Sequence, residues 1–135
     1  MAPPTDPSVL VVDDDAIIRL DACAILNDAG FRCYEAASGD EAIAMLHQLG
    51  QALTLLFTDV EMPGSTDGFA LARFTAEQWP EIEIVVASGR RRPDPGDMPE
   101  KATFVGKPFD EHVVHSHLAQ TLPQGKKPEP LRQLL

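Results

Sequence analysis

The sequence has little that would place it in a membrane or export it. Within its 135 residues, no apolar run approaches the ~20 residues that a membrane-spanning helix needs. Residues 1–7, Met-Ala-Pro-Pro-Thr-Asp-Pro, have neither the basic start nor the apolar segment of a secretory signal. We therefore expect a cytoplasmic protein without a membrane span.

Positive charge is also scarce. The chain has 11 Lys and Arg residues against 21 Asp and Glu residues, which gives a net charge of −10. A sequence-independent grip on nucleic acid relies on Lys and Arg side chains over the phosphates. This charge balance argues against direct nucleic-acid binding, so we expect the chain to act through other proteins.

The chain contains only two cysteines, Cys23 and Cys33. Because nothing in the sequence marks it for an oxidising compartment, we expect reduced core cysteines rather than a disulfide. Apolar residues make up 44% of the chain, and its length suits one globular domain with a single core.

Apolar runs alternate with segments of helical period, which is the pattern of βα units around a parallel sheet. Asp15 fits the N-cap of the first helix, and Ser38 lies three residues before Glu41 in a capping-box spacing. The runs predict strands at residues 8–12, 31–35, 53–58, 82–87 and 103–106. The helical periods predict helices at residues 16–29, 38–49, 67–78 and 109–122.

One connection breaks this pattern. Residues 89–100 contain three prolines and two glycines where a helix is expected between the fourth and fifth strands. Each proline inside a helix costs about 3 kcal/mol. We therefore expect the fourth helix of the fold to be short or missing, with at most a turn or two around residues 97–101.

Polar residues stand where the predicted strands end. Asp13 and Asp14 follow the first strand, Asp59 the third, Ser88 the fourth and Lys107 the fifth. If these strands are neighbours, their carboxyl ends meet at one edge of the sheet and bring the side chains together. Adjacent carboxylates repel each other unless a cation such as Mg²⁺ binds them, and Mg²⁺ commonly bridges a carboxylate to a phosphate. The set predicts a site for a divalent cation and an anionic group.

Asp59 is the candidate nucleophile of this site, because carboxylates form acyl phosphates in phosphoryl transfer. The metal and the Lys107 ammonium would neutralise the phosphoryl oxygens. The Ser88 hydroxyl and the backbone N–H groups of Val60 and Gly89 would add hydrogen-bond donors. The residue types therefore predict phosphoryl transfer to Asp59.

Five short motifs occur in a fixed order: Val-Val-Asp13-Asp14, Asp59-Val-Glu-Met-Pro63, Asp67-Gly68, Ser88-Gly89 and Lys107-Pro108-Phe109. Through them, residues 8–122 resemble the response-regulator receiver domain of two-component signalling. The resemblance implies a doubly wound α/β fold, with a flavodoxin-like five-stranded parallel sheet of strand order 2-1-3-4-5. It leaves residues 1–7 as an N-terminal extension and residues 123–135 as a C-terminal tail.

The resemblance also assigns roles to the acidic residues and the lysine. In that family, the aspartate that matches Asp59 accepts a phosphoryl group from a histidine kinase or a histidine phosphotransfer protein. The match implies that Asp13, Asp14 and Asp59 bind Mg²⁺ together with the backbone carbonyl of Glu61. Lys107 matches the lysine that pairs with the phosphoryl oxygens.

A conformational switch is implied as well. Ser88 matches the hydroxyl that shifts toward the phosphoryl group, and Phe104 matches the aromatic whose rotamer follows it. Arg90, two residues past Ser88, faces the mouth of the pocket in the family layout. We expect Arg90 or Arg91 to contact the phosphoryl group or its exit path, and Glu61 is a second candidate modulator.

We expect a stand-alone receiver that works as a phosphorylation-dependent binding switch, a phosphorelay intermediate or a phosphate sink. Apart from its own phosphorylation and dephosphorylation, we expect no enzymatic activity. Its expected partners are a histidine kinase or histidine phosphotransfer protein and an unknown downstream protein, with a homodimer as a further option.

Two alternatives stay open. One is an interaction module with the receiver fold that works without phosphorylation. The other is a phosphatase of the haloacid-dehalogenase type, which also uses an aspartate at a strand end and Mg²⁺. That family needs a second aspartate two residues after the nucleophile, where this chain has Glu61.

The last predicted helix carries His112, His115 and His117. His112 and His115 share one helix face, a spacing compatible with a metal site. Because no third ligand is evident, we expect surface histidines instead.

The proline-rich segment 123–130 after this helix is typical of a linker or tail. Beyond it, leucines recur with helical spacing. Such a tail is expected to dock on a partner or a second copy through Leu131, Leu134 and Leu135.

Overall fold

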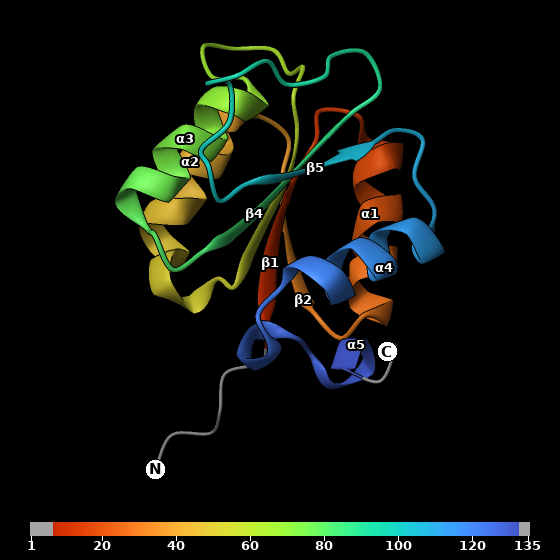
Figure 1. Ribbon diagram of the computed structural model, residues 1–135. Helices are drawn as coiled ribbons and strands as arrows, with labels where there is room; N and C mark the ends of the chain where they lie inside the picture. The colour runs from red at the N-terminus through yellow and green to blue at the C-terminus, as the bar shows by residue number, and fades with distance from the viewer. Residues whose placement is uncertain (1–6, 133–135) are drawn as a thin grey trace.

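The computed structural model of the protein describes residues 7–132 (Figure 1). Its centre is one five-stranded parallel sheet in the order β2-β1-β3-β4-β5, which confirms the predicted topology. β1 is buried along its whole length, which explains why it reads as a continuous apolar run. The strands are β1 Ser8–Val12, β2 Arg32–Ala36, β3 Leu55–Asp59, β4 Glu83–Ser88 and β5 Thr103–Gly106.

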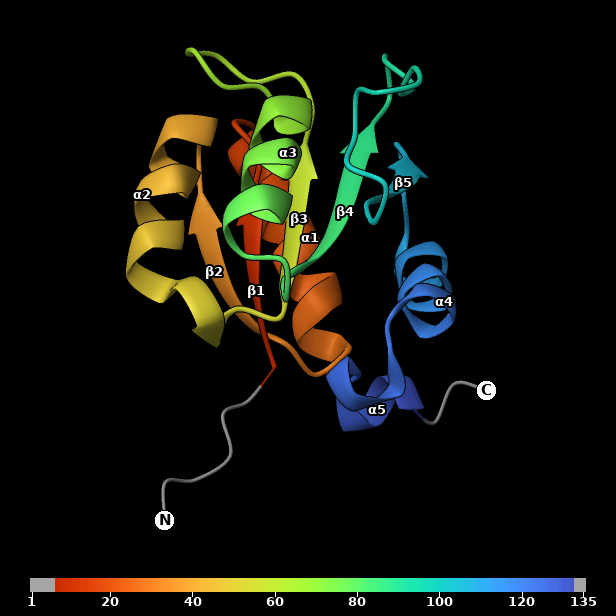
Figure 2. The same cartoon turned by 60° about the vertical axis from the view of Figure 1, so that its left-hand side comes forward.

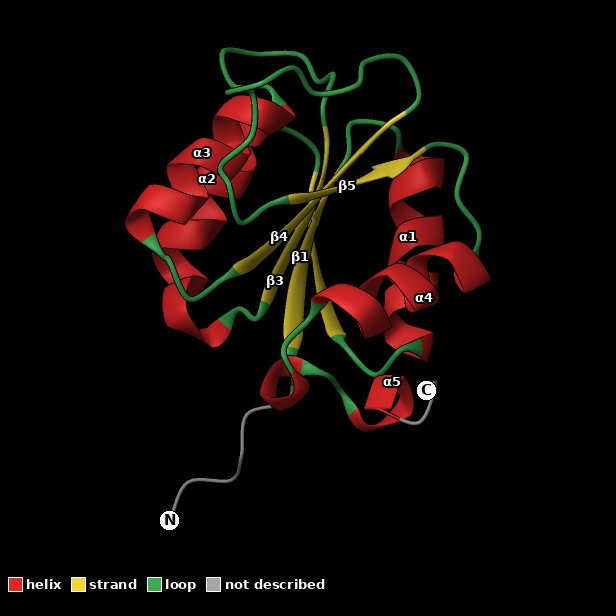
Figure 3. Cartoon of the chain, in the orientation of Figure 1, coloured by secondary structure: helices red, strands yellow, loops and turns green. Residues whose placement is uncertain are grey.

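Helices cover both faces of the sheet, as Figure 3 shows. α1 Ala16–Asp28 and α4 Glu111–Thr121 lie on one face, and α2 Gly39–Leu49 and α3 Gly68–Gln78 lie on the other. Apolar side chains fill the space between each helical layer and the sheet in two clusters. The architecture is therefore the predicted doubly wound α/β fold. Across residues 7–132, no helix is both long enough and apolar enough to cross a membrane.

The first two helices begin at the predicted caps. The Asp15 carboxylate accepts hydrogen bonds from the backbone N–H groups of Ile17 and Ile18 at the start of α1. The Ser38 hydroxyl accepts one from the N–H of Glu41 at the start of α2. These side chains satisfy N–H groups that have no partner within the helix.

No helix connects β4 to β5 in the described part of the chain, which agrees with the prediction that the helix between the fourth and fifth strands is short or missing. Residues 89–102 form an irregular loop that leaves the end of β4 and returns past α3 to the start of β5 (Figures 1 and 2). The backbone carbonyl of Asp97 accepts a 2.5 Å hydrogen bond from Arg73 Nη1 of α3. Ala102 is buried and Met98 is half-buried against the same apolar cluster as α3. The far half of the loop is therefore attached to the core.

The described part of the predicted tail packs against the rest of the protein. A short 3-10 turn, η2 Gln124–Lys126, leads to a short helix, α5 Glu129–Arg132, which lies below α1 and α4 (Figures 1 and 2). Leu131 is only 1% exposed and belongs to the apolar cluster of α1 and α4. Leu134 and Leu135, which are predicted to share its helical spacing, lie outside the described residues. Leu131 thus docks on its own chain.

Gly30, at the end of α1, makes room for this C-terminal segment. Its φ of +105° favours glycine, and a Cβ at this position would lie 2.6 Å from the Cβ of Pro128. Nearer the start of the segment, Lys126 Nζ donates to Glu83 Oε2 at 2.7 Å. The described residues after the predicted boundary at residue 122 therefore stay packed against the rest of the domain.

Two histidines of α4 hold the helix in place. His115 Nε2 lies 2.8 Å from the backbone oxygen of Ile25 in α1. His117 Nε2 lies 2.8 Å from Thr103 Oγ1 in β5, and burial lowers the pKa of His117. The expectation of surface histidines is therefore incomplete: His115 and His117 are partly buried, one against α1 and the other against β5, whereas His112 is exposed.

Candidate functional site

Neighbouring strands end level with one another at one edge of the sheet. Asp59 and Ser88 are the last residues of β3 and β4, one position beyond the predicted strand ends. Asp13 and Lys107 come directly after β1 and β5, so all four residues meet at this edge. The last paired residues are Val12 with Thr58, Asp59 with Ala87, and Ser88 with Gly106.

The start of α3 lies directly against the backbone of Asp59. Gly68 donates its N–H to the carbonyl of Val60 at 2.8 Å. A Cβ at Gly68 would lie 1.9 Å from the carbonyl oxygen of Asp59, so no other residue fits there unless the strand end moves. Asp67 caps α3 by accepting from the N–H of Ala70 at 2.8 Å. The Asp-Gly pair noted in the sequence therefore fixes the backbone behind Asp59.

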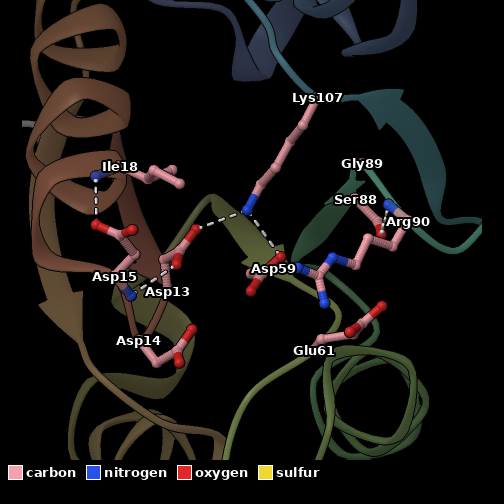
Figure 4. Close-up of a pocket in the computed structure, with 10 residues that line it drawn as sticks. All are labelled: Asp13, Asp14, Asp15, Ile18, Asp59, Glu61, Ser88, Gly89, Arg90 and Lys107. Atoms are coloured by element: carbon pink, nitrogen blue, oxygen red, sulfur yellow. Dashed lines mark hydrogen bonds and ion pairs between the residues drawn. The ribbon is translucent and has the colours of Figure 1, made fainter.

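Lys107 joins two carboxylates of the site. Its Nζ lies 2.8 Å from Asp59 Oδ1 and 3.0 Å from Asp13 Oδ2 (Figure 4). The three side chains are only 17%, 10% and 7% exposed, respectively, so solvent and salt screen these ion pairs weakly. The peptide bond between Lys107 and Pro108 is cis.

The shared ammonium does not satisfy both acids equally. Burial raises the pKa of Asp59 above its usual range, and the hydrogen bond from Lys107 offsets only part of this rise. Burial acts to lower the pKa of Lys107, but its hydrogen bonds to Asp59 and Asp13 and their negative charges together outweigh burial and raise that pKa. The lysine is therefore firmly charged, whereas its contacts do not fully offset the cost of burying the negative charge of Asp59.

Three carboxylates converge in this region. One oxygen from each of Asp13, Asp14 and Asp59 lies within 4.8 Å of the others. Their three negative charges exceed the single positive charge of Lys107 by two. A cluster of oxygen donors with this surplus suits a hard divalent cation such as Mg²⁺. The donor set is therefore compatible with the predicted metal.

The Ser88 hydroxyl is engaged by the loop that follows it. Ser88 Oγ accepts hydrogen bonds from the backbone N–H of Arg91 at 3.0 Å and of Arg90 at 3.3 Å. The guanidinium carbon of Arg92, the next residue, lies 5.8 Å from the ring centroid of Phe104. The hydroxyl and the aromatic that the family resemblance assigns to a common switch are thus connected through three consecutive arginines.

These groups surround one open pocket of about 340 Å³. Figure 4 shows the Arg90 side chain extending across the pocket toward Asp59, with Glu61 below it. Among the residues predicted for the site, Val60, Arg91 and Phe104 do not line this pocket. The lining residues are Asp13, Asp14, Asp15, Ile18, Asp59, Glu61, Ser88, Gly89, Arg90 and Lys107.

A sequence model of the response regulator receiver domain matches residues 9–119, a range that includes every residue of the pocket. The chain belongs to the response regulator receiver domain family. The resemblance seen in the sequence motifs is therefore confirmed.

Receivers of larger signalling proteins are among its relatives. The chain is 34% identical over 107 residues to the sensor kinase CckA of Brucella abortus (strain 2308), covering 76% of this chain and 11% of that protein. It is 37% identical over 87 residues to the transcriptional regulatory protein AruR of Pseudomonas aeruginosa, covering 62% of this chain and 35% of that protein. The receiver thus spans a minor part of each of these relatives.

Solved receiver structures share the fold. The crystal structure of a response regulator receiver protein from Sinorhizobium medicae WSM419 superimposes with a TM-score of 0.78 at 31% identity. The alignment covers 85% of this chain and 93% of that one. The likeness therefore extends over nearly the whole receiver.

Arg19 is one contributor to the receiver's pocket that the sequence analysis does not identify. This residue of α1 donates from Nη1 to the backbone oxygen of Asp13 at 2.7 Å and from Nε to Glu35 Oε1 at 3.0 Å. It therefore ties the end of β1 to α1 and β2. A basic residue in the first turns of the helix after the acidic strand end is the only sequence signal for this role.

Proposed function

We propose that this receiver accepts a phosphoryl group on Asp59 from a histidine kinase or a histidine phosphotransfer protein in the cytoplasm. It then signals through a phosphorylation-dependent protein contact, or passes the group on as a phosphorelay intermediate or sink. The observation that carries the proposal is the Asp59 carboxylate at the end of β3, 2.8 Å from the Lys107 ammonium and lining an open pocket. Relatives that include a sensor kinase and a transcriptional regulatory protein support the same role.

The proposed transfer uses groups that already line the pocket. A carboxylate oxygen of Asp59 attacks phosphorus, and the bond from phosphorus to the donor imidazole nitrogen breaks. The imidazole leaves with the electron pair and takes up a proton. Lys107 neutralises the phosphoryl oxygens, while the Ser88 hydroxyl and the N–H of Gly89 donate hydrogen bonds to them.

Mg²⁺ is the cofactor in this proposal. Asp13, Asp14 and Asp59 would hold it together with the backbone carbonyl of Glu61. The bound ion would neutralise charge on the phosphoryl oxygens. The support for it is the surplus of two negative charges that Lys107 leaves in the cluster of three carboxylates.

Ser88 and Phe104 form the switch in this proposal. When Ser88 Oγ turns toward a phosphoryl group on Asp59, its hydrogen bond from Arg91 N–H is weakened. Arg92 follows directly in the chain and stacks on Phe104, so the change reaches the aromatic ring. Phosphorylation adds roughly −1.5 to −2 charges, which shift the equilibrium through contacts that differ between the two states.

Arg90 and Glu61 are the proposed modulators of the phosphoryl lifetime, because they place opposite charges on the wall of the same pocket. We expect Arg90→Ala to change the half-life of the acyl phosphate several-fold, and Glu61→Ala to change it independently. Arg32→Ala, which removes an exposed arginine on β2, is the matched control. An Arg90→Ala half-life equal to that of the wild type would remove Arg90 from the proposal.

The test of Asp59 is incubation with acetyl phosphate and Mg²⁺, followed over time by intact mass. We expect one gain of about 80 Da, which corresponds to a single phosphoryl group. Asp59→Asn should show no gain. Asp15→Asn makes the same substitution on the residue that caps α1 and lines the same pocket, so this variant should still be phosphorylated.

The outcomes of this test separate the alternatives. A phosphoryl group that is lost quickly indicates a sink, and one that persists indicates a binding switch. If neither acetyl phosphate nor a phosphorylated histidine phosphotransfer protein labels the wild type, the proposal is wrong. The interaction module that works without phosphorylation would then be the better description.

A further inference from the structure

The two cysteines face each other across the seam between α1 and β2. Cys23 is buried in α1, with 6% of its surface exposed, and Cys33 is half-buried on the edge strand β2. Cys33 Sγ donates to the backbone carbonyl of Cys23 at 3.5 Å. The thiols therefore lie close together on two elements that the ion pair between Arg19 and Glu35 also joins.

The environment makes the two thiols unequal. The Cys33 thiol, which donates to the backbone carbonyl of Cys23 and also toward its sulfur, lowers the pKa of Cys23 more than burial raises it. The hydrogen bond toward the Cys23 sulfur, together with burial, raises the pKa of Cys33. Cys23 is therefore the better thiolate, and Cys33 keeps its proton and supplies the partial exposure through which a small oxidant reaches the pair.

We propose that Cys23 and Cys33 form a peroxide-reactive dithiol whose disulfide clamps α1 to β2. The Cys23 thiolate attacks one oxygen of a hydroperoxide and the O–O bond breaks, which leaves a sulfenic acid on Cys23. The Cys33 sulfur then attacks the Cys23 sulfur, the S–O bond breaks and water leaves with the Cys33 proton. With hydrogen peroxide, two thiols lose two electrons and two protons, and the peroxide becomes two molecules of water.

The clamp lies next to the contacts that brace the acidic pocket. Arg19 precedes Cys23 by one helical turn on α1, and Glu35 follows Cys33 by two residues on β2, so both pairs share one seam. Arg19 bonds Glu35 across this seam and also bonds the backbone oxygen of Asp13. The dithiol itself contains no residue of the pocket, so its reactivity does not depend on phosphorylation of the receiver.

Mass spectrometry of the full chain tests the proposal. The reduced protein is treated with hydrogen peroxide, and the remaining thiols are alkylated. We expect a loss of about 2 Da and no alkylation, with both effects reversed by dithiothreitol. Trypsin separates the cysteines by cleaving after Arg32, so peptides 20–32 and 33–73 stay joined only where Cys23 and Cys33 are bonded.

The Cys33→Ser variant provides the control, because it removes the half-buried thiol and leaves the buried one in place. We expect it to lose the 2 Da change, and to form a dimedone adduct on Cys23 that marks the trapped sulfenic acid. Three results would overturn the proposal: both wild-type thiols remain alkylatable after excess peroxide, only Cys33 is oxidised, or the disulfide joins two chains.

Discussion

Two connections leave adjacent strands beside the pocket, and they are held in place in different ways. The connection after β3 contains α3, which buries Phe69 and Leu71 in the core. The connection after β4 has no helix and places only Ala102 and part of Met98 in that core. Its first residues are instead held by the Ser88 hydroxyl. The second connection is therefore the one that a movement of the hydroxyl reaches directly.

The largest expected effect contrasts the packing of the two connections. Leu71→Ala removes a side chain that is 0% exposed, which should lower the free energy of unfolding by about 2–5 kcal/mol. Met98→Ala removes a half-buried side chain from the irregular loop and should cost less than about 2 kcal/mol. Urea unfolding of both variants under the same conditions measures the difference. Equal losses would show that the loop is packed as firmly as α3.

The sequence predicts the features that local patterns determine. Each apolar run that ends on Asp59, Ser88 or Lys107 predicts a strand and also the position where that strand ends. Once the strands are placed side by side in their order, these end residues come together and form the pocket. The prolines of residues 89–100 exclude a helix through backbone chemistry alone. Both features depend on residues that are near each other in the chain.

Contacts between distant segments are less accessible from the sequence. Leu131 is buried against the domain because its segment meets α1 and α4, and no local pattern specifies that meeting. The same holds for Arg19 on the Asp13 carbonyl and for His117 on Thr103. In each case the role of the residue depends on a contact with a segment that is distant in the sequence and close only in the folded protein.

A change in the charge of Asp59 can show whether the connection that contains α3 is independent of the acidic site. Because folding raises the pKa of Asp59, the protonated carboxyl stabilises the fold at low pH, and this contribution is lost as pH rises through the folded pKa. The raised pKa of Lys107 keeps its own contribution throughout the neutral range. Relative to the wild type, Asp59→Asn should therefore gain free energy of unfolding as pH rises above about 4.

Urea unfolding in EDTA across this pH range measures that gain. Added Mg²⁺ should reduce it, because the cation stabilises the ionised wild-type site. At each pH, α3 amides that exchange by local opening should exchange equally fast in the wild type and Asp59→Asn, since Gly68 lies against the carbonyl of Asp59 and not its carboxylate. A pH-independent difference between the two proteins would contradict the argument.

Removing the Ser88 hydroxyl should loosen only the irregular connection. Ser88→Ala deletes the acceptor of the Arg90 and Arg91 N–H groups, and a hydrogen bond of this kind contributes about 1 kcal/mol. We expect amide exchange at these residues to become roughly five- to tenfold faster, while α3 keeps its protection. Ser88→Thr retains a hydroxyl and should preserve the slow exchange. Faster exchange in both connections would show that they are not separable.

The smallest expected effect concerns Arg91, which links the two connections. Its guanidinium carbon lies 5.2 Å from the ring centroid of Phe69, and its Nη1 lies 3.8 Å from Asp67 Oδ2. Both side chains of this ion pair are more than a third exposed, at 49% and 39%, so Arg91→Gln should cost less than about 1 kcal/mol.

A double-mutant cycle between Arg91 and Ser88 tests whether that link depends on the hydroxyl. Ser88 Oγ holds the backbone of Arg91, so Ser88→Ala already displaces the guanidinium from Phe69. The effects of Arg91→Gln and Ser88→Ala on the free energy of unfolding should therefore be non-additive by about 0.5 kcal/mol. Arg32→Gln in place of Arg91→Gln should give additive losses. Additive effects of Arg91→Gln and Ser88→Ala would mean that the arginine binds α3 without help from Ser88. A movement of the hydroxyl would then leave the contact with α3 unchanged.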